Sequence, residues 1–193
     1  MRGRPSIFDN DTIIKKAQQV FWTKGYTATS LDDLLQAMGI GSGSFYHQFK
    51  GGKKELFSLA LKQRRAAFRE FEERLHKAEF PVELIRDFFL GIARTDLGSH
   101  VCGCLISNTV VEMASLDADL EREAVAIMKD VEQLYTNAIK AAQQNGQLSN
   151  QTDPSLLGRY LITFYNGLNI TRRMYPDQDQ LSALIILQME IIR

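Results

Sequence analysis

The sequence contains few of the residues that interrupt helices or cross-link small folds. Only four prolines occur in 193 residues and alternating β-branched stretches are rare, so the composition favours helices over strands. The two cysteines, Cys102 and Cys104, are too close in sequence for a disulfide framework, which agrees with a reducing compartment. The apolar run from Ala183 to Leu187 is far too short to cross a bilayer, and no apolar segment follows the N-terminal arginines. We therefore expect a cytoplasmic protein without a membrane partner.

A net charge of zero conceals a separation of charge along the chain. Residues 1–65 contain eleven Lys and Arg against five Asp and Glu, whereas the other residues contain twelve against eighteen. A basic first third on a more acidic remainder is typical of a nucleic-acid-binding head on a solvated body. The alternative is that the charges cluster by chance, so the residue pattern within the basic segment has to show whether it binds nucleic acid.

Apolar spacing predicts an all-α fold of about nine helices. The first helix starts after Asp9 and stops at Gly25, and the next two cover Leu31–Met38 and Ser42–Gln48. Further helices are expected at 53–78, 81–97, 103–115, 117–145, 153–175 and 178–193. We divide the chain into a DNA-binding domain, residues 1–52, and a C-terminal helical bundle for ligand binding and dimerisation, residues 53–193.

The second and third expected helices have the length and spacing of a helix-turn-helix. Gly39 allows the chain to reverse, Ile40 fills the angle between the helices, and Phe45 and Phe49 pack inward. The other face of the third helix then presents short hydrogen-bonding groups, which suit base edges and phosphates. The candidate DNA contacts are Thr29, Ser30, Ser42, Ser44, Tyr46, His47, Lys50 and Lys53, with Arg2 and Arg4 as an arm for the minor groove or a solvated tail.

Three sequence segments strengthen this prediction: Gly25-Tyr26-Thr27-Ala28-Thr29-Ser30-Leu31, Gly39-Ile40, and Gly43-Ser44-Phe45-Tyr46-His47-Gln48-Phe49. Together they resemble the signature of the tetracycline-repressor (TetR/AcrR) family over residues 8–60. The resemblance implies DNA contacts from Thr29, Ser42, Ser44, Tyr46, His47 and Lys50 or Lys53, and a C-terminal domain that binds effectors and dimerises through its last two long helices. Two departures are visible: Ile40-Gly41-Ser42-Gly43 lacks the lysine usual at the turn, and Gly51 or Gly52 is an extra residue.

The C-terminal half offers aromatic and polar groups on apolar helices, which could line a pocket for a small organic effector or simply form core. The candidate pocket residues are Phe88, Phe89, Cys104, Asn108, Glu112, Met113, Tyr135, Tyr160 and Phe164. Apolar surface on the last two helices exceeds one bundle face, which indicates a homodimer seam, although intramolecular packing must use part of it. The candidate seam residues are Leu157, Leu161, Leu168, Leu184, Leu187 and Ile191.

His100, Cys102 and Cys104 form the most reactive cluster of the sequence. Because they lie where a helix is expected to begin, a thiol there could sense electrophiles or oxidants. A metal site would have three ligands and no obvious fourth, and cysteine is also a common small buried residue.

The sequence therefore predicts a ligand-responsive regulator that is released from a palindromic operator by a small-molecule effector, with thiol sensing through Cys102 and Cys104 as the alternative trigger. We expect no cofactor, no metal and no enzymatic activity, since neither a His-Glu-x-x-His motif nor a nucleophile elbow occurs. The glycines of residues 39–43 follow a helix rather than a strand, which argues against a nucleotide loop. A helical adaptor protein would leave the basic head unused.

Overall fold

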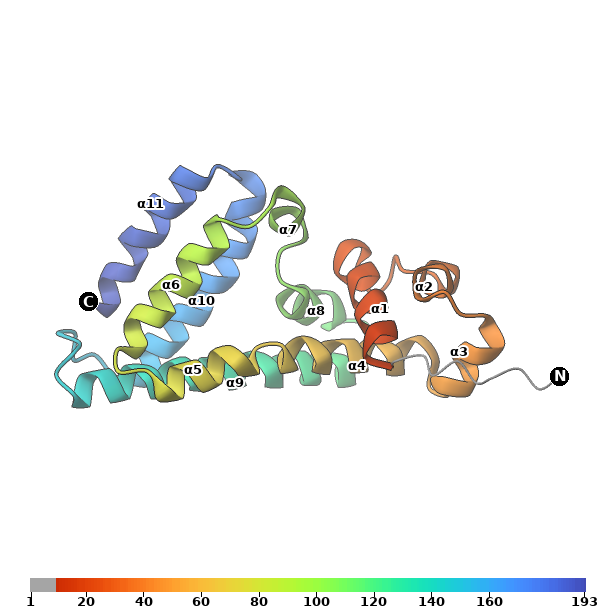
Figure 1. Ribbon diagram of the computed structural model, residues 1–193, viewed down its shortest axis with the longest axis horizontal. Coiled ribbons are helices and arrows are strands. Elements are labelled where there is room, and N and C mark those ends of the chain that lie inside the picture. Colours follow the sequence, from red (N-terminus) through yellow and green to blue (C-terminus); the bar gives the residue numbers. More distant parts are fainter. Residues whose placement is uncertain (1–9) are drawn as a thin grey trace.

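The computed structural model describes residues 10–193, and this part of the chain is helical without a β-strand. Figure 1 shows an elongated molecule in which the long helix α9 (Ala118–Gln144) runs beside α4 (Gly52–Ala66) and α5 (Arg69–Lys77). A head of α1 (Asn10–Lys24), α2 (Leu31–Met38) and α3 (Ser42–Gln48) lies at one end. At the other end are α6 (Pro81–Ala93), α10 (Pro154–Met174) and α11 (Gln178–Met189), followed by the short 3₁₀ helix Glu190–Ile192. Two short helices, α7 (Leu97–Cys102) and α8 (Leu105–Met113), connect the two ends.

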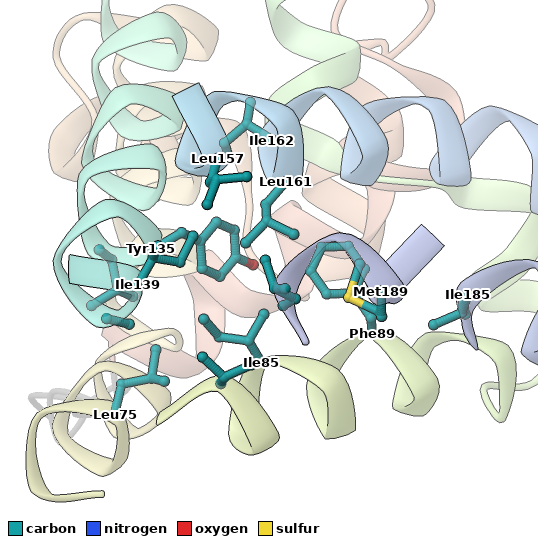
Figure 2. Close-up of a cluster of buried hydrophobic side chains, with 14 of the residues drawn as sticks. Leu75, Ile85, Phe89, Tyr135, Ile139, Leu157, Leu161, Ile162, Ile185 and Met189 are labelled. Carbon is teal, nitrogen blue, oxygen red and sulfur yellow. The ribbon is translucent and has the colours of Figure 1, made fainter. Parts of the chain in front are cut away.

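Two hydrophobic clusters hold this arrangement together. One lies at the C-terminal end and includes Leu75, Phe89 and Tyr135 packed among aliphatic side chains from α6, α9, α10 and α11 (Figure 2). The other joins the head to the body, because side chains such as Phe21 and Phe57 share it with Met113 of α8. The second cluster makes α8 a direct packing partner of the head.

The all-α prediction is confirmed, and three expected helices differ clearly in extent. The helix expected at 178–193 ends at Met189 and is followed by the 3₁₀ helix Glu190–Ile192. The segment 53–78 is divided into α4 and α5. Between them the N–H of Phe68 donates to the carbonyl of Arg65, three residues earlier, and this is the tighter hydrogen bond of a 3₁₀ turn. The turn brings Phe68 against Phe71 and Phe88, with ring centroids 5.0 and 5.5 Å away. The helix expected at 81–97 ends at Ala93, and the separate helix α7 begins where the carboxylate of Asp96 accepts a bond from the N–H of Ser99.

No helix of the described residues is long and apolar enough to span a membrane.

Candidate nucleic-acid interface and ligand cavity

The helix-turn-helix is built from local signals that the sequence carries. Ser30 caps α2 in a capping box: its hydroxyl accepts from the N–H of Asp33, and the Asp33 carboxylate accepts from the N–H of Ser30. Gly39 ends α2 in the left-handed region with φ 71°, a conformation that favours glycine. The chain then turns and α3 begins at Ser42.

The outer face of α3 is open to solvent. Phe45 and Phe49 are buried and hold the helix on the head, as expected. The side chains of Ser42, Ser44, Tyr46, His47 and Lys50 are exposed, and Tyr46 keeps 55% of its surface accessible. These five residues form one accessible set on and just after a helix of the size that enters a major groove.

Three of the other predicted DNA contacts already form hydrogen bonds within the protein. Thr29 is only 1% exposed, and its hydroxyl donates to the carbonyl of Gly25 at 2.5 Å. The ammonium of Lys53 donates to the carbonyl of Thr29 at 2.8 Å and lies 4.4 Å from the ring centroid of Tyr26. The Ser30 side chain is exposed, but both its hydroxyl and its N–H are used in the capping box.

The start of α2, beside the predicted DNA contacts Thr29 and Ser30, carries a negative charge. Asp33 forms an ion pair with Lys24, 2.6 Å between the carboxylate oxygen and the ammonium nitrogen. This bond and those from Ser30 lower the pKa of Asp33 to about 2, so it is ionised at neutral pH. The predicted arm residues Arg2 and Arg4 lie outside the described residues.

A cavity of about 240 Å³ opens between α4, α6, α8, α9 and α10. Three of the predicted pocket residues, Phe88, Cys104 and Tyr135, line it. Arg64 and Tyr165, which are not among the candidate pocket residues, also line this cavity. A side chain's direction across a bundle depends on packing that periodicity does not specify.

The other predicted pocket residues lie elsewhere. Phe89 and Met113 are completely buried in the two separate clusters. Tyr160 donates its hydroxyl to the carbonyl of Gln188 at 3.2 Å, and Phe164 stacks on Phe89 with ring centroids 5.3 Å apart. The amide of Asn108 donates to the carbonyl of Cys102 at 3.0 Å. A second groove beside α8, with a volume of about 310 Å³, includes Asn108.

Glu112 connects the body to the head instead of facing the cavity. Its carboxylate accepts from the N–H of Tyr26 at 3.0 Å and from the N–H of Thr27 at 2.7 Å. A Cβ at Gly25 would lie 3.2 Å from the same carboxylate, so glycine, here at φ 83°, permits the close approach. Burial opposes ionisation of Glu112, but the hydrogen bonds from Thr27 and Tyr26 outweigh it and hold its pKa below the ordinary value.

The His100, Cys102 and Cys104 segment does not assemble a metal site. Among residues 10–193, no group of three or more His, Cys, Asp and Glu side chains is placed to hold a metal ion. Cys104 is buried and Cys102 is half-buried, and both are free thiols. His100 is buried, and burial followed by the charge of Arg172 lowers its pKa.

The exposed apolar surface of α10 and α11 differs from the predicted seam. Leu157, Leu161 and Leu168 are buried in the core of a single chain, so they are not available to a partner. Leu184 and Ile191 are half-buried, while Leu187 is 68% exposed as a seam residue should be. The large apolar side chains that α10, α11 and the residue after α10 leave exposed are Leu156, Ile170, Met174, Tyr175, Ile186 and Leu187, called the α10–α11 face below.

Two family profiles match this chain. "Bacterial regulatory proteins, tetR family" matches residues 13–60, and "Tetracyclin repressor-like, C-terminal domain" matches residues 85–185. Together these matches cover the head and most of the body.

Individual proteins agree with the profiles. An uncharacterised HTH-type transcriptional regulator of Bacillus subtilis, YezE, is 30% identical over 98% of this chain and 99% of that protein. The HTH-type transcriptional repressor ComR of Escherichia coli is 29% identical over 95% of this chain and 88% of that protein. Among solved structures, a cysteine mutant of the TetR family transcriptional regulator CifR complexed with 26-bp double-strand operator DNA has a similar fold. Its TM-score is 0.79, with 24% identity over 97% of this chain and 98% of that chain.

Proposed function

Because the chain belongs to the tetR family of bacterial regulatory proteins, we propose that it binds a palindromic operator as a homodimer and is released by a small-molecule effector. The observation that carries the proposal is the exposed set Ser42, Ser44, Tyr46, His47 and Lys50 on a capped helix-turn-helix. The action is regulation by binding in the cytoplasm, without an enzymatic reaction.

The five exposed residues supply the chemistry that duplex DNA requires. Hydroxyl and imidazole groups of α3 reach base edges in the major groove, while the ammonium of Lys50 neutralises a backbone phosphate. The missing lysine at the turn, where Gly41 and Ser42 stand, makes Lys50 the principal phosphate contact of this helix. Lys53 supports the head through Thr29 instead.

Dimerisation uses the α10–α11 face in this proposal. Six large apolar side chains are exposed on these two helices and the residue after α10, and their association with a partner would remove them from water. A twofold dimer through this face presents two α3 helices, and a palindrome matches that symmetry. The corrected seam therefore consists of Leu187 and the outward side of α10, such as Ile170 and Met174.

The effector acts through linkage, with the cavity beside α8 as its site. If operator and effector favour different positions of the head relative to the body, each weakens the binding of the other. Glu112 at one end of α8 and Cys104 at the other provide a physical connection between head and cavity.

Operator selection from a random duplex library tests the proposal. We expect the full-length dimer to recover a palindrome and to bind it less tightly as salt increases. Lys50→Ala should weaken binding and reduce the slope of log K against log salt by about 1, whereas Lys140→Ala, at an exposed site on α9, should change neither. Recovery of no preferred palindrome, or equal salt slopes for the two variants, would contradict it.

A second trigger is favoured by the position of Cys104 on the cavity wall. With 1,4-benzoquinone, the Cys104 sulfur would form a bond to a ring carbon. The thiol proton and the proton displaced from that ring carbon would each move to one of the two quinone oxygens. The product is a hydroquinone joined to Cys104 by a thioether. Benzoquinone should then release operator from the wild type and from Cys102→Ser, but not from Cys104→Ser. Release that persists in Cys104→Ser would eliminate this trigger.

A further inference from the structure

The cavity has an unbalanced positive charge. Arg64 and Arg65 line it, and none of its lining residues is acidic. Arg65 is neutralised by Glu72, 3.1 Å between nitrogen and oxygen, and by Asp130 at 3.8 Å. Arg64 forms no ion pair within residues 10–193, and its guanidinium lies 5.1 Å from the ring centroid of Trp22. One of the two lining arginines is therefore available to a ligand anion.

A second unpaired cation lies directly behind the cavity wall. Arg172 is 6% exposed, and its Nη2 donates to the carbonyl of Gly103 at 2.9 Å. Its Nε has no hydrogen-bond partner, and no carboxylate of the described residues pairs with it. A buried charge without a counterion is costly, so an anion bound nearby would be stabilised by Arg172. Burial lowers the pKa of Arg172, and the charge of Arg64 adds to that effect.

The N-terminus of α8 adds positive potential at the same place. Its N-cap is Cys104, whose side chain makes no capping bond, and its first turn contains no acidic residue. The first N–H groups of the helix therefore keep their partial positive charge, which attracts anions. Cys104 lines the cavity and follows Gly103, whose carbonyl accepts from Arg172, so Arg172 lies beside the start of α8. Arg64 lines the same cavity and is close enough to Arg172 for its charge to lower the pKa of Arg172.

The other lining residues indicate the size and polarity of the uncharged part of a ligand. Phe68, Phe88, Ile127 and Val131 make one side apolar. Tyr135 is 1% exposed, and its hydroxyl forms no hydrogen bond with the described residues although the side chain lines the cavity. A volume of about 240 Å³ is below the range of roughly 300–1,000 Å³ that is usual for drug-sized ligands. The occupant is consequently about the size of one ring.

We propose that the effector is a small organic monoanion, a one-ring or short branched carboxylate, held between Arg64 and the start of α8 with its apolar part against Phe68 and Phe88. This inference rests on the proposed function, in which the cavity is the effector site. Arg172 acts from behind Gly103 as a fixed positive charge. Tyr135 supplies a further hydrogen bond, and a cationic ligand is disfavoured at this wall.

Matched pairs of neutral and charged probes test the charge requirement. Titration calorimetry would compare benzoate with benzamide and phenylacetate with phenylacetamide on the full-length protein. We expect at least one carboxylate to bind about tenfold more tightly than its amide, which corresponds to about 1.4 kcal/mol. An amide that binds as tightly as its acid, or the absence of carboxylate binding at millimolar concentration, overturns the proposal.

Arginine variants locate the charge. Arg64→Met and Arg172→Met should each reduce the preference for carboxylate, while Arg69→Met, at an exposed position of α5, should leave it unchanged. Arg172→Met replaces an unpaired buried charge by an unbranched apolar side chain, so it is expected to fold, which a thermal melt verifies. A preference that survives both Arg64→Met and Arg172→Met would contradict the assignment.

Operator binding without any probe separates this proposal from the function on which it rests. If the protein binds no operator, the proposed function fails regardless of the calorimetry. If it binds operator tightly but ignores all the carboxylates, only the anionic effector fails. A carboxylate that binds should also weaken operator binding, and the operator should weaken carboxylate binding by the same factor.

Discussion

Glu112→Gln changes one carboxylate oxygen to an NH₂ group while nearly preserving the shape of the side chain. In the wild type the two oxygens accept from the N–H groups of Tyr26 and Thr27 at 3.0 and 2.7 Å. Glutamine can accept only one of these bonds, and its NH₂ must face the other N–H. A hydrogen bond to a charged group contributes about 1.5–3 kcal/mol, and Glu112 is partly solvated, so we expect a loss of about 1–2 kcal/mol of local stability.

Amide hydrogen exchange measures this loss at the two donors themselves. A loss of about 1.4 kcal/mol corresponds to tenfold faster exchange, so the amides of Tyr26 and Thr27 should exchange about five- to thirtyfold faster in the variant. Glu73→Gln removes the same charge from an exposed site on α5 and should leave both rates unchanged. Equal exchange rates at Tyr26 and Thr27 in wild type and Glu112→Gln would refute the argument.

The acid dependence of the same bonds has a defined sign. Because the pKa of Glu112 is lower in the folded protein than its ordinary value of 4.5, its ionised form stabilises the fold above that value. This stabilisation disappears as the pH falls through the lowered pKa. The difference in unfolding free energy between wild type and Glu112→Gln should therefore be largest at neutral pH and should narrow in acid. A difference that widens below pH 4.5 would contradict the hydrogen-bond account.

Further predictions concern packing and assembly. In Gly158→Ala the new Cβ would lie 2.2 Å from the hydroxyl of Thr136 and 3.1 Å from backbone atoms of α9, so urea denaturation should show a loss of about 1–3 kcal/mol. Gly91→Ala has open space around it and should gain up to about 1 kcal/mol from helix propensity; similar effects of the two alanines would disprove the close α9–α10 contact. Leu187→Asp should shift the dimer toward monomer in sedimentation, whereas Leu116→Asp, equally apolar and exposed but away from the α10–α11 face, should not. If both variants dissociate to monomers to the same extent, the α10–α11 face is not the dimer interface.

Local features of the head were predictable because the signals that specify them are local. The capping box of Ser30 and Asp33 needs only two residues three positions apart, and Gly39 alone supplies the left-handed turn. Thr29 could not be placed in this way. Its burial follows from a bond to Gly25 and from Lys53 reaching across from α4, and both depend on how the helices pack.

The dimer seam shows a different limit of sequence reasoning. Helix α10 carries two apolar stripes, one with Leu157 and Leu161 and another with Leu156 and Ile170, offset by one position. Periodicity identifies both stripes, but it cannot say which one faces the core. Only the packing of α10 on α9 and α11 decides, and it buries the stripe that was expected to be free.

The positive charge of the cavity was harder still to predict from sequence, because it comes from arginines that lack an acidic partner. Sequence patterns indicate which cations are present, whereas Arg65 is neutral in effect only because Glu72 and Asp130 reach it. Arg64 and Arg172 differ from it through the absence of such neighbours in the described fold. An unpaired charge is a property of the folded arrangement and not of any motif.

The same unpaired charge provides a source for the coupling energy that regulation requires. Without a ligand, Arg172 is buried near Arg64 with no counterion, so the protein carries an electrostatic cost at the start of α8. An anion at this wall removes part of that cost and attracts the helix end. Because α8 has nine residues, the cavity wall and the carboxylate of Glu112 are joined by about 14 Å of one helix, which moves as a unit. A displacement at Cys104 would therefore reach Tyr26 and Thr27, a few residues before the capping box of α2. Glu112→Gln should reduce the effect of a bound carboxylate on operator affinity while leaving carboxylate affinity itself nearly unchanged.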